Sequence, residues 1–302
     1  MLLDELSYYV QNEVPVHLIY IPQSRLVDRN FVEEHFRNHL LREVYGNPSR
    51  WRESLPARPK ILGKPIDVTD ERQLCRFIIR QIVTYAILSH RWEQEEVTYS
   101  ECISIYKPPE TAYNFSGRNK LWRFLDAASS IGIQFAWADT CCIDKSSSAE
   151  LDEAIRSMFR WYQNSALCVV HLAQTNFLGD MHRDEWFNRG WTLQELLAPS
   201  RIKFVNKDWE LLVGAYNDKD NRKVTQIPLE VLAEPFVPKT DKINTKMRWA
   251  ALRKTTRAED SAYSLMGMLG VSIRTAYGEG RTRAFHRLIK AVVDDVKDLS
   301  VL

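Results

Sequence analysis

The stretch YAILSHRW, residues 85–92, opens the part of the chain that decides the fold. Its first half, YAIL, is a short apolar run and predicts a buried strand. Its second half, SHRW, is polar and aromatic and is expected to form the loop that leaves this strand. Serine, histidine and arginine can hydrogen-bond anions or sugars, and tryptophan can stack on a ring. The same four residues also suit an ordinary polar loop with a half-buried Trp92.

Strands and helices continue to alternate beyond residue 92. Because such alternation is typical of parallel sheets, we expect a sheet with helices packed on its faces. In these sheets ligands bind beyond the carboxyl ends of the strands, which is where the SHRW loop would lie. Apolar runs and helical spacing predict strands over 133–137, 167–172 and 202–205, and helices over 119–130, 150–163 and 191–197.

Additions are predicted on both sides of this core. An N-terminal extension, residues 1–79, would contain a strand over 14–21 and a helix over 29–45. The α/β core would occupy residues 80–210, with the strand over 202–205 as its last. The remaining residues, 211–302, begin as a polar stretch. They end in two apolar stripes at helical spacing, which predict helices over 258–269 and 285–296.

Composition excludes several classes of protein. The 302 residues carry a formal net charge of +2, which is too small to indicate attraction to nucleic acid or to a membrane surface. No apolar run approaches the roughly 20 residues that span a bilayer. Five cysteines without a CxxC spacing argue against a disulfide framework and against a zinc site, so no metal is expected. Free thiols suit a reducing compartment, and we expect a cytoplasmic protein.

Two carboxylates and one thiol are candidates for chemistry. Asp139 follows the strand over 133–137, where it can bind a substrate hydroxyl, fix a loop or simply cap the following turn. Glu195 lies one helical turn after Trp191 and beside apolar residues, which should raise its pKa, although many helices place a glutamate beside a tryptophan. Cys142 is a possible thiol nucleophile, but the sequence shows nothing near it that would activate it.

Five segments, in order along the chain, resemble the motifs of one family. The family is the fungal heterokaryon-incompatibility (HET) domain, and the resemblance extends from about Tyr85 to Leu288. Many HET domains carry an aromatic residue and a cysteine after the first serine, where this chain has His90 and Arg91. The matching segments are residues 85–92, 135–165, 189–195 (RGWTLQE), 256–265 (TRAEDSAYSL) and 277–280 (YGEG).

The HET domain is similar in turn to the Toll/interleukin-1-receptor (TIR) fold, a flavodoxin-like, three-layer core around a parallel sheet. Several TIR domains hydrolyse NAD with a glutamate on a helix that also carries a tryptophan. The resemblance therefore implies that Glu195 is the catalytic carboxylate. It also implies a substrate-binding set around Glu195, consisting of Ser89, His90, Arg91, Trp92, Asp139 and Trp191.

These resemblances imply a cell-death effector that cleaves the nicotinamide–ribose bond of NAD. NAD would be its substrate rather than a cofactor. Self-association into a homo-oligomer would activate it, with an upstream receptor or sensor protein as a further partner. Two alternatives stay open: a non-catalytic death-signalling module that distinguishes self from nonself through protein contacts, and a thiol enzyme built on Cys142.

Overall fold

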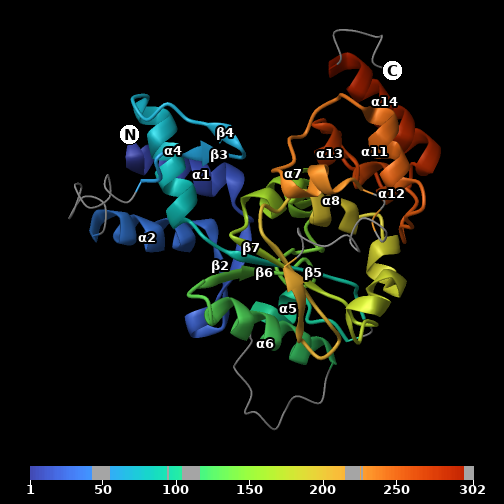
Figure 1. Ribbon diagram of the computed structural model, residues 1–302, viewed down its shortest axis with the longest axis horizontal. Helices are drawn as coiled ribbons and strands as arrows, with labels where there is room; N and C mark the ends of the chain where they lie inside the picture. The colour runs from blue at the N-terminus through green and yellow to red at the C-terminus, as the bar shows by residue number, and fades with distance from the viewer. Residues whose placement is uncertain (43–54, 94, 104–115, 215–224, 226, 296–302) are drawn as a thin grey trace.

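The computed structural model describes residues 1–42, 55–93, 95–103, 116–214, 225 and 227–295. Seven strands form its central sheet: β1 (His17–Tyr20), β2 (Arg25–Asp28), β5 (Ala86–His90), β6 (Phe135–Trp137), β7 (Leu167–His171), β8 (Ile202–Val205) and β9 (Leu211–Gly214). Across the sheet they lie in the order β2-β1-β6-β5-β7-β8-β9 (Figure 1). The four middle strands run parallel, and the strands at both edges are antiparallel.

The predicted parallel core is confirmed as a mixed α/β arrangement. Each of the four predicted core strands is present, as β5, β6, β7 and β8. Every residue of β5 and β7 is buried, as expected for central parallel strands covered on both faces. The chain moves from β5 to β6 in one direction and then crosses back over β5 to reach β7. This reversal creates a switch point between the carboxyl ends of β5 and β7, the place where such sheets bind ligands.

Helices cover the two faces of the sheet. Figure 1 shows α6 (Ser116–Ser129) on one side, and α7 (Ser148–Asn164) with α8 (Thr192–Leu197) on the other. This division follows from the right-handed crossover rule, because the chain reverses its direction across the sheet after β6. The short helix α5 (Tyr99–Ile103) and the 3-10 helices η4 (Leu178–Arg183) and η5 (Glu185–Asn188) complete the connections.

The edges of the sheet differ from the prediction. The strand predicted over 14–21 is shorter, because residues 21–23 form a 3-10 turn that leads into the unpredicted strand β2. At the other edge β9 follows β8, so the expectation that residues 202–205 form the last strand is wrong. Both missed strands contain four residues and are held by pairing with a neighbour. Such short strands carry too little alternation of their own to be recognised.

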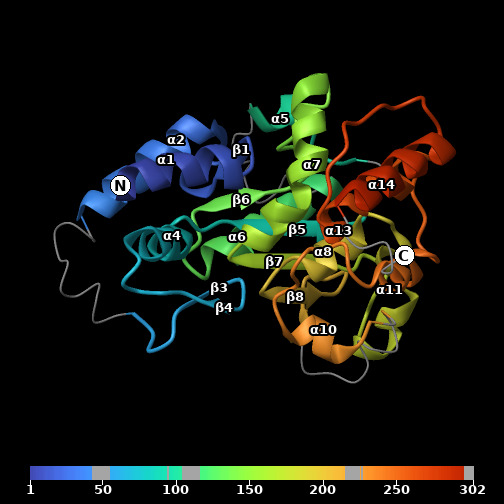
Figure 2. The same ribbon diagram turned by 90° about the horizontal axis from the view of Figure 1, so that it is seen from above.

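The N-terminal residues add helices beside the edge strands. These are α1 (Leu2–Glu13), α2 (Arg29–Leu40) and α4 (Glu71–Ile82), and α1 packs against the other two (Figure 2). The Asp28 carboxylate accepts a hydrogen bond from the amide of Phe31 at 2.9 Å and caps α2. Residues 43–45 of the helix predicted over 29–45 lie outside the described residues. Strands β3 (Lys60–Ile61) and β4 (Lys64–Pro65) pair as a small separate hairpin.

The last four helices gather beside α7 and α8 (Figure 1). They are α11 (Ile243–Ala250), α12 (Asp260–Tyr263), α13 (Met266–Leu269) and α14 (Arg281–Asp295), and the short helix α10 (Leu229–Ala233) precedes them in the chain. The helix predicted over 258–269 is wrong as a single helix, because the structure divides it into α12 and α13. Gly267 lets α13 pack directly on α7, since a Cβ at this position would lie 2.1 Å from Phe159 Cβ. The helix predicted over 285–296 is present as α14 and begins four residues earlier.

Candidate functional site

A buried hydrogen bond joins Ser89 to Glu195 at the carboxyl end of β5. The Ser89 hydroxyl donates to Glu195 Oε2 at 2.5 Å. Ser89 is the fourth residue of β5, and Glu195 lies on α8, which follows β7 in the chain. Packing of α8 over β5 therefore brings together two residues that are 106 positions apart. Ser89 is 1% exposed and Glu195 7% exposed, so both lie beneath the surface.

Two aromatic residues surround this pair. Trp186 Nε1 donates to Ser89 Oγ at 2.8 Å, which directs the serine proton toward Glu195. Tyr162 also hydrogen-bonds the Glu195 side chain, and its hydroxyl lies 3.1 Å from the carbonyl oxygen of Leu88. Neither residue belongs to the site predicted from the sequence. Trp186 lies in a 3-10 helix with no strand or helix periodicity, and Tyr162 has the pattern of an ordinary core residue.

The surroundings of Glu195 change its acidity. Burial raises the pKa of Glu195 to about 7, and the nearby Asp139 carboxylate adds to the rise. The hydrogen bonds from Ser89 and Tyr162 and the charge of Arg189 act in the opposite direction. The apolar neighbours seen in the sequence predicted the rise, whereas only the structure identifies Asp139 as a second cause. A carboxyl group with a pKa near neutrality suits proton transfer, because both protonation states are populated.

We expect the effect of Glu195→Gln on the free energy of unfolding to be about 2.5 kcal/mol more stabilising at pH 8 than at pH 5. The folded-state pKa of Glu195 is raised from 4.5 to about 7, so the stability of the protonated form is lost as pH rises through about 7. Glutamine does not ionise, so position 195 no longer lowers the free energy of unfolding as the pH rises. Denaturant unfolding at both pH values gives the comparison. An equal effect of the substitution at pH 5 and pH 8 would contradict the raised pKa.

Asp139 is held by the loop that follows β5. Trp92 Nε1 donates to Asp139 Oδ2 at 2.8 Å, and the Lys145 ammonium lies 4.1 Å from the centre of the Trp92 ring. Of the three roles considered for Asp139, this contact supports fixing a loop. Arg91, in the same loop, forms an ion pair of 2.7 Å with Glu185, one residue before Trp186. The exposed Trp92 and Arg91 therefore lie on the surface near the buried Ser89–Glu195 pair.

The structure separates His90 and Trp191 from this group. Successive residues of a strand point to opposite faces, so His90 faces α6 while Ser89 faces α8. His90 Nε2 lies 3.5 Å from Glu96 Oε2, and Glu96 pairs with the buried Lys120 of α6. Trp191 precedes Glu195 by one helical turn, but its side chain hydrogen-bonds the Asp260 carboxyl of α12. The predicted set is therefore divided between two faces of the sheet and the C-terminal helices.

The cysteines lie inside the protein. All five are buried free thiols. Cys142 Sγ accepts a hydrogen bond from the Ala138 amide at 3.5 Å, within the turn that follows β6. Within the described ranges, no group of three or more histidine, cysteine or acidic side chains is arranged to hold a metal ion.

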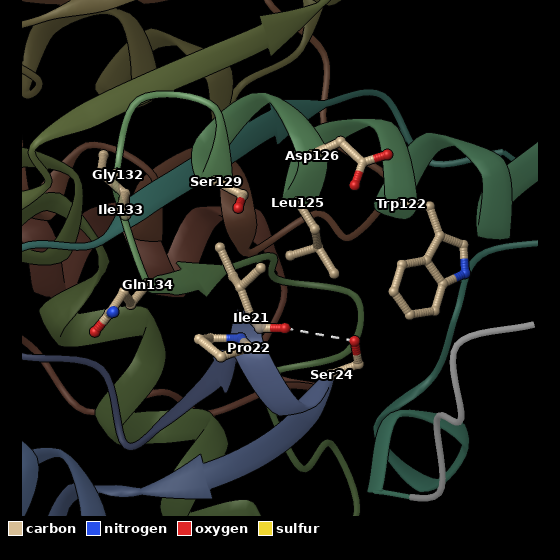
Figure 3. Close-up of a pocket in the computed structure, with 10 residues that line it drawn as sticks. All are labelled: Ile21, Pro22, Ser24, Trp122, Leu125, Asp126, Ser129, Gly132, Ile133 and Gln134. Atoms are coloured by element: carbon tan, nitrogen blue, oxygen red, sulfur yellow. Dashed lines mark hydrogen bonds between the residues drawn. The ribbon is translucent and has the colours of Figure 1, made fainter.

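Among the cavities on the described surface are three whose linings do not include Glu195. The first, of about 390 Å³, lies between α6 and the turn after β1 (Figure 3). Its wall includes Gln134, which precedes β6, so it opens at the amino ends of the parallel strands. The third, of about 490 Å³, shares Gln134 and lies at the same end. The second, of about 170 Å³, lies behind α8 and is lined by Gly190 and Arg253.

Comparisons with known proteins agree on one family. Residues 85–180 match the family model described as heterokaryon incompatibility protein (HET). The vegetative incompatibility protein HET-E-1 of Podospora anserina is 40% identical over 231 residues, which cover 71% of this chain and 16% of that relative. The chain thus corresponds to a small part of the relative's length. No solved structure gives a significant match. Among the helices that the structure describes, none is long and apolar enough to cross a membrane.

Proposed function

Because the chain is a heterokaryon-incompatibility (HET) domain protein, we propose that it is a cell-death effector that hydrolyses the nicotinamide–ribose bond of NAD. Glu195 is its catalytic carboxylate. The observation that carries this proposal is the environment of Glu195. Its side chain is nearly buried, has a pKa of about 7 and accepts a hydrogen bond from Ser89 at the carboxyl end of β5.

The arrangement of the sheet supports a TIR-like core. Its four parallel strands lie in the order β6-β5-β7-β8, so the first of them in the chain is second across the sheet. This is the strand order of flavodoxin-like sheets, in which ligands bind where the order reverses. Ser89 stands at that reversal, on the face covered by α8. The position of the Ser89–Glu195 pair therefore agrees with a ligand site of this class of fold.

The residues present suit the cleavage of NAD. When the bond between ribose C1′ and the nicotinamide nitrogen breaks, its electron pair passes to the cationic ring, which leaves as neutral nicotinamide. The Glu195 carboxylate stabilises the positive charge that develops on the ribose. Water then adds to C1′ and yields ADP-ribose, and Glu195 accepts the proton of that water and passes it to solvent. Ser89, oriented by Trp186, holds the carboxylate in place.

The proposal also requires the site to open. Glu195 is 7% exposed, and Ser89, Trp186 and Tyr162 surround its carboxyl group. The 3-10 helix η5 carries both Trp186 and Glu185, the ion-pair partner of Arg91. A shift of η5 would break this exposed ion pair and, in the same movement, expose the Ser89–Glu195 pair. We propose that self-association drives this shift, so that the closed form shown here is inactive.

The enclosure of Glu195 also favours a second candidate, a non-catalytic module that signals cell death through protein contacts. Incubating the chain with NAD at low and at high protein concentration, and measuring nicotinamide release, separates the two. We expect release that increases more than proportionally with protein concentration. No release at any concentration, including from assembled protein, would favour the non-catalytic module.

The thiol alternative predicts a different dependence. Cys142 is buried against the backbone of Ala138, so we expect Cys142→Ser to retain nicotinamide release at close to the unsubstituted rate. Circular dichroism would establish that the variant is folded. Loss of release in a folded Cys142→Ser protein would instead support thiol chemistry.

A further inference from the structure

The cavity behind α8 has the lining of an anion site. Its walls come from the loop before α8 and from helices α11, α12 and α14. Two arginines and three hydroxyl residues line it, together with apolar side chains, and no carboxylate residue is among them. The polar members are Arg253, Thr255, Ser261, Ser264 and Arg281.

Three groups in this cavity have hydrogen-bonding capacity to spare. Ser264 is 2% exposed, and its Oγ faces Gly190, since a Cβ built on that glycine would lie 3.5 Å from it. Within the described part of the chain, the Ser264 hydroxyl makes no hydrogen bond. The same is true of the Arg281 side chain and of Nη2 of Arg253, whose Nε and Nη1 have backbone and hydroxyl partners. Thr255 and Ser261 already donate to backbone carbonyl oxygens.

Ser264 is a buried residue that lines the cavity, and its hydroxyl is therefore free to donate to a ligand there. A bound anion would accept from Ser264 and from both guanidinium groups at once. The size of the cavity limits the choice of anion. Its volume of about 170 Å³ is below the roughly 300–1,000 Å³ of sites for drug-sized ligands. It therefore suits a single phosphate group better than a whole dinucleotide.

We propose that this cavity binds a phosphate group, either as free phosphate or as the end of a nucleotide, between Arg253, Arg281 and Ser264. The site goes beyond the proposed hydrolysis of NAD, because Glu195 does not line it. The two sites are connected through Arg253, whose Nη1 donates to Thr192 Oγ1 at 2.8 Å, at the start of the helix that carries Glu195. A phosphate held by Arg253 thus contacts a residue that helps to position α8.

Isothermal titration calorimetry of the full chain tests this site, with inorganic phosphate and ADP as probes at constant ionic strength. We expect one saturable site for phosphate. Arg281→Gln should weaken binding about tenfold, and Ser264→Ala should weaken it severalfold while leaving the cavity walls in place. Arg283→Gln is the matched control, because Arg283 is exposed on the same helix and does not line the cavity. Its affinity should equal that of the unsubstituted chain.

The probes and controls decide among the outcomes. Tighter binding of ADP identifies a nucleotide as the source of the phosphate group, and equal binding identifies free phosphate. Absence of saturable binding of both probes would overturn the proposal. So would equal weakening by Arg281→Gln and Arg283→Gln, which indicates general attraction to surface charge. Because calorimetry does not depend on turnover, failure of NAD hydrolysis leaves this test intact.

Discussion

Replacing Glu195 by glutamine is expected to reduce nicotinamide release from NAD about a thousandfold. Glutamine has the shape of glutamate, and its amide oxygen can still accept the hydrogen bond from Ser89. It lacks the negative charge that stabilises the ribose cation, and it cannot accept the proton of the attacking water. Measurement of the release rate for both proteins, under conditions in which the unsubstituted chain turns over, gives the ratio directly.

A matched substitution distinguishes this effect from a general loss of charge. Glu34→Gln removes an exposed glutamate on α2, far along the chain from Glu195, and should leave the rate unchanged. Circular dichroism and the unfolding midpoint should show that both variants are folded. A folded Glu195→Gln protein that retains the rate of the unsubstituted chain would show that Glu195 is not the catalytic carboxylate.

The pH dependence of the rate offers a further check on the same residue. Since the ionised form of Glu195 is the active one, the rate should rise with pH and level off above about 7. The hydrogen bond from Ser89 lowers the pKa of Glu195, so Ser89→Ala should move this inflection to higher pH. A rate that is flat between pH 5 and 8 would contradict the role of the carboxylate.

Replacing Lys120 by methionine is expected to destabilise the protein by about 3–5 kcal/mol. Lys120 is 3% exposed, hydrogen-bonds the Glu96 carboxylate and lies 3.6 Å from Glu93. Burial alone would raise the pKa of Glu96, but His90 and Lys120 together lower it to about 2. Removing the ammonium leaves a largely buried carboxylate without its lysine partner. Denaturant unfolding at pH 7 measures the loss.

Two comparisons make this prediction specific. Lys290→Met removes an exposed lysine paired with Asp294 on α14, and it should change the stability little. Adding Glu96→Gln to Lys120→Met removes the unpaired charge and should recover part of the lost stability. Because the lowered pKa of Glu96 stabilises the fold above about pH 4.5, the Lys120→Met effect should shrink as pH falls toward 2. Similar losses of stability for Lys120→Met and Lys290→Met would show that the buried Lys120–Glu96 pair stabilises the fold no more than an exposed ion pair does.

The central part of the fold was predictable because its signals are local. Each core strand is a short apolar run, and each covering helix carries an apolar stripe, so β5 to β8 and the helices between them follow from neighbouring residues alone. The ordered motifs identified the family, and the comparisons confirm it. The edge strands of the sheet were harder to predict from the sequence, because β2 and β9 are strands chiefly through pairing with their neighbours.

The candidate site shows the same division between local and distant causes. The sequence by itself placed Ser89 in the loop after a strand and Glu195 beside apolar residues on a helix. The loop assignment is wrong for Ser89 and His90, because β5 extends through both of them. Only the tertiary structure decided that these two side chains meet, that Trp186 orients the serine, and that His90 turns to the opposite face to join Glu96 and Lys120. The physical reason is that hydrogen bonding and burial depend on residues from other elements of the fold, 106 positions apart in the case of Ser89 and Glu195, which no local pattern records.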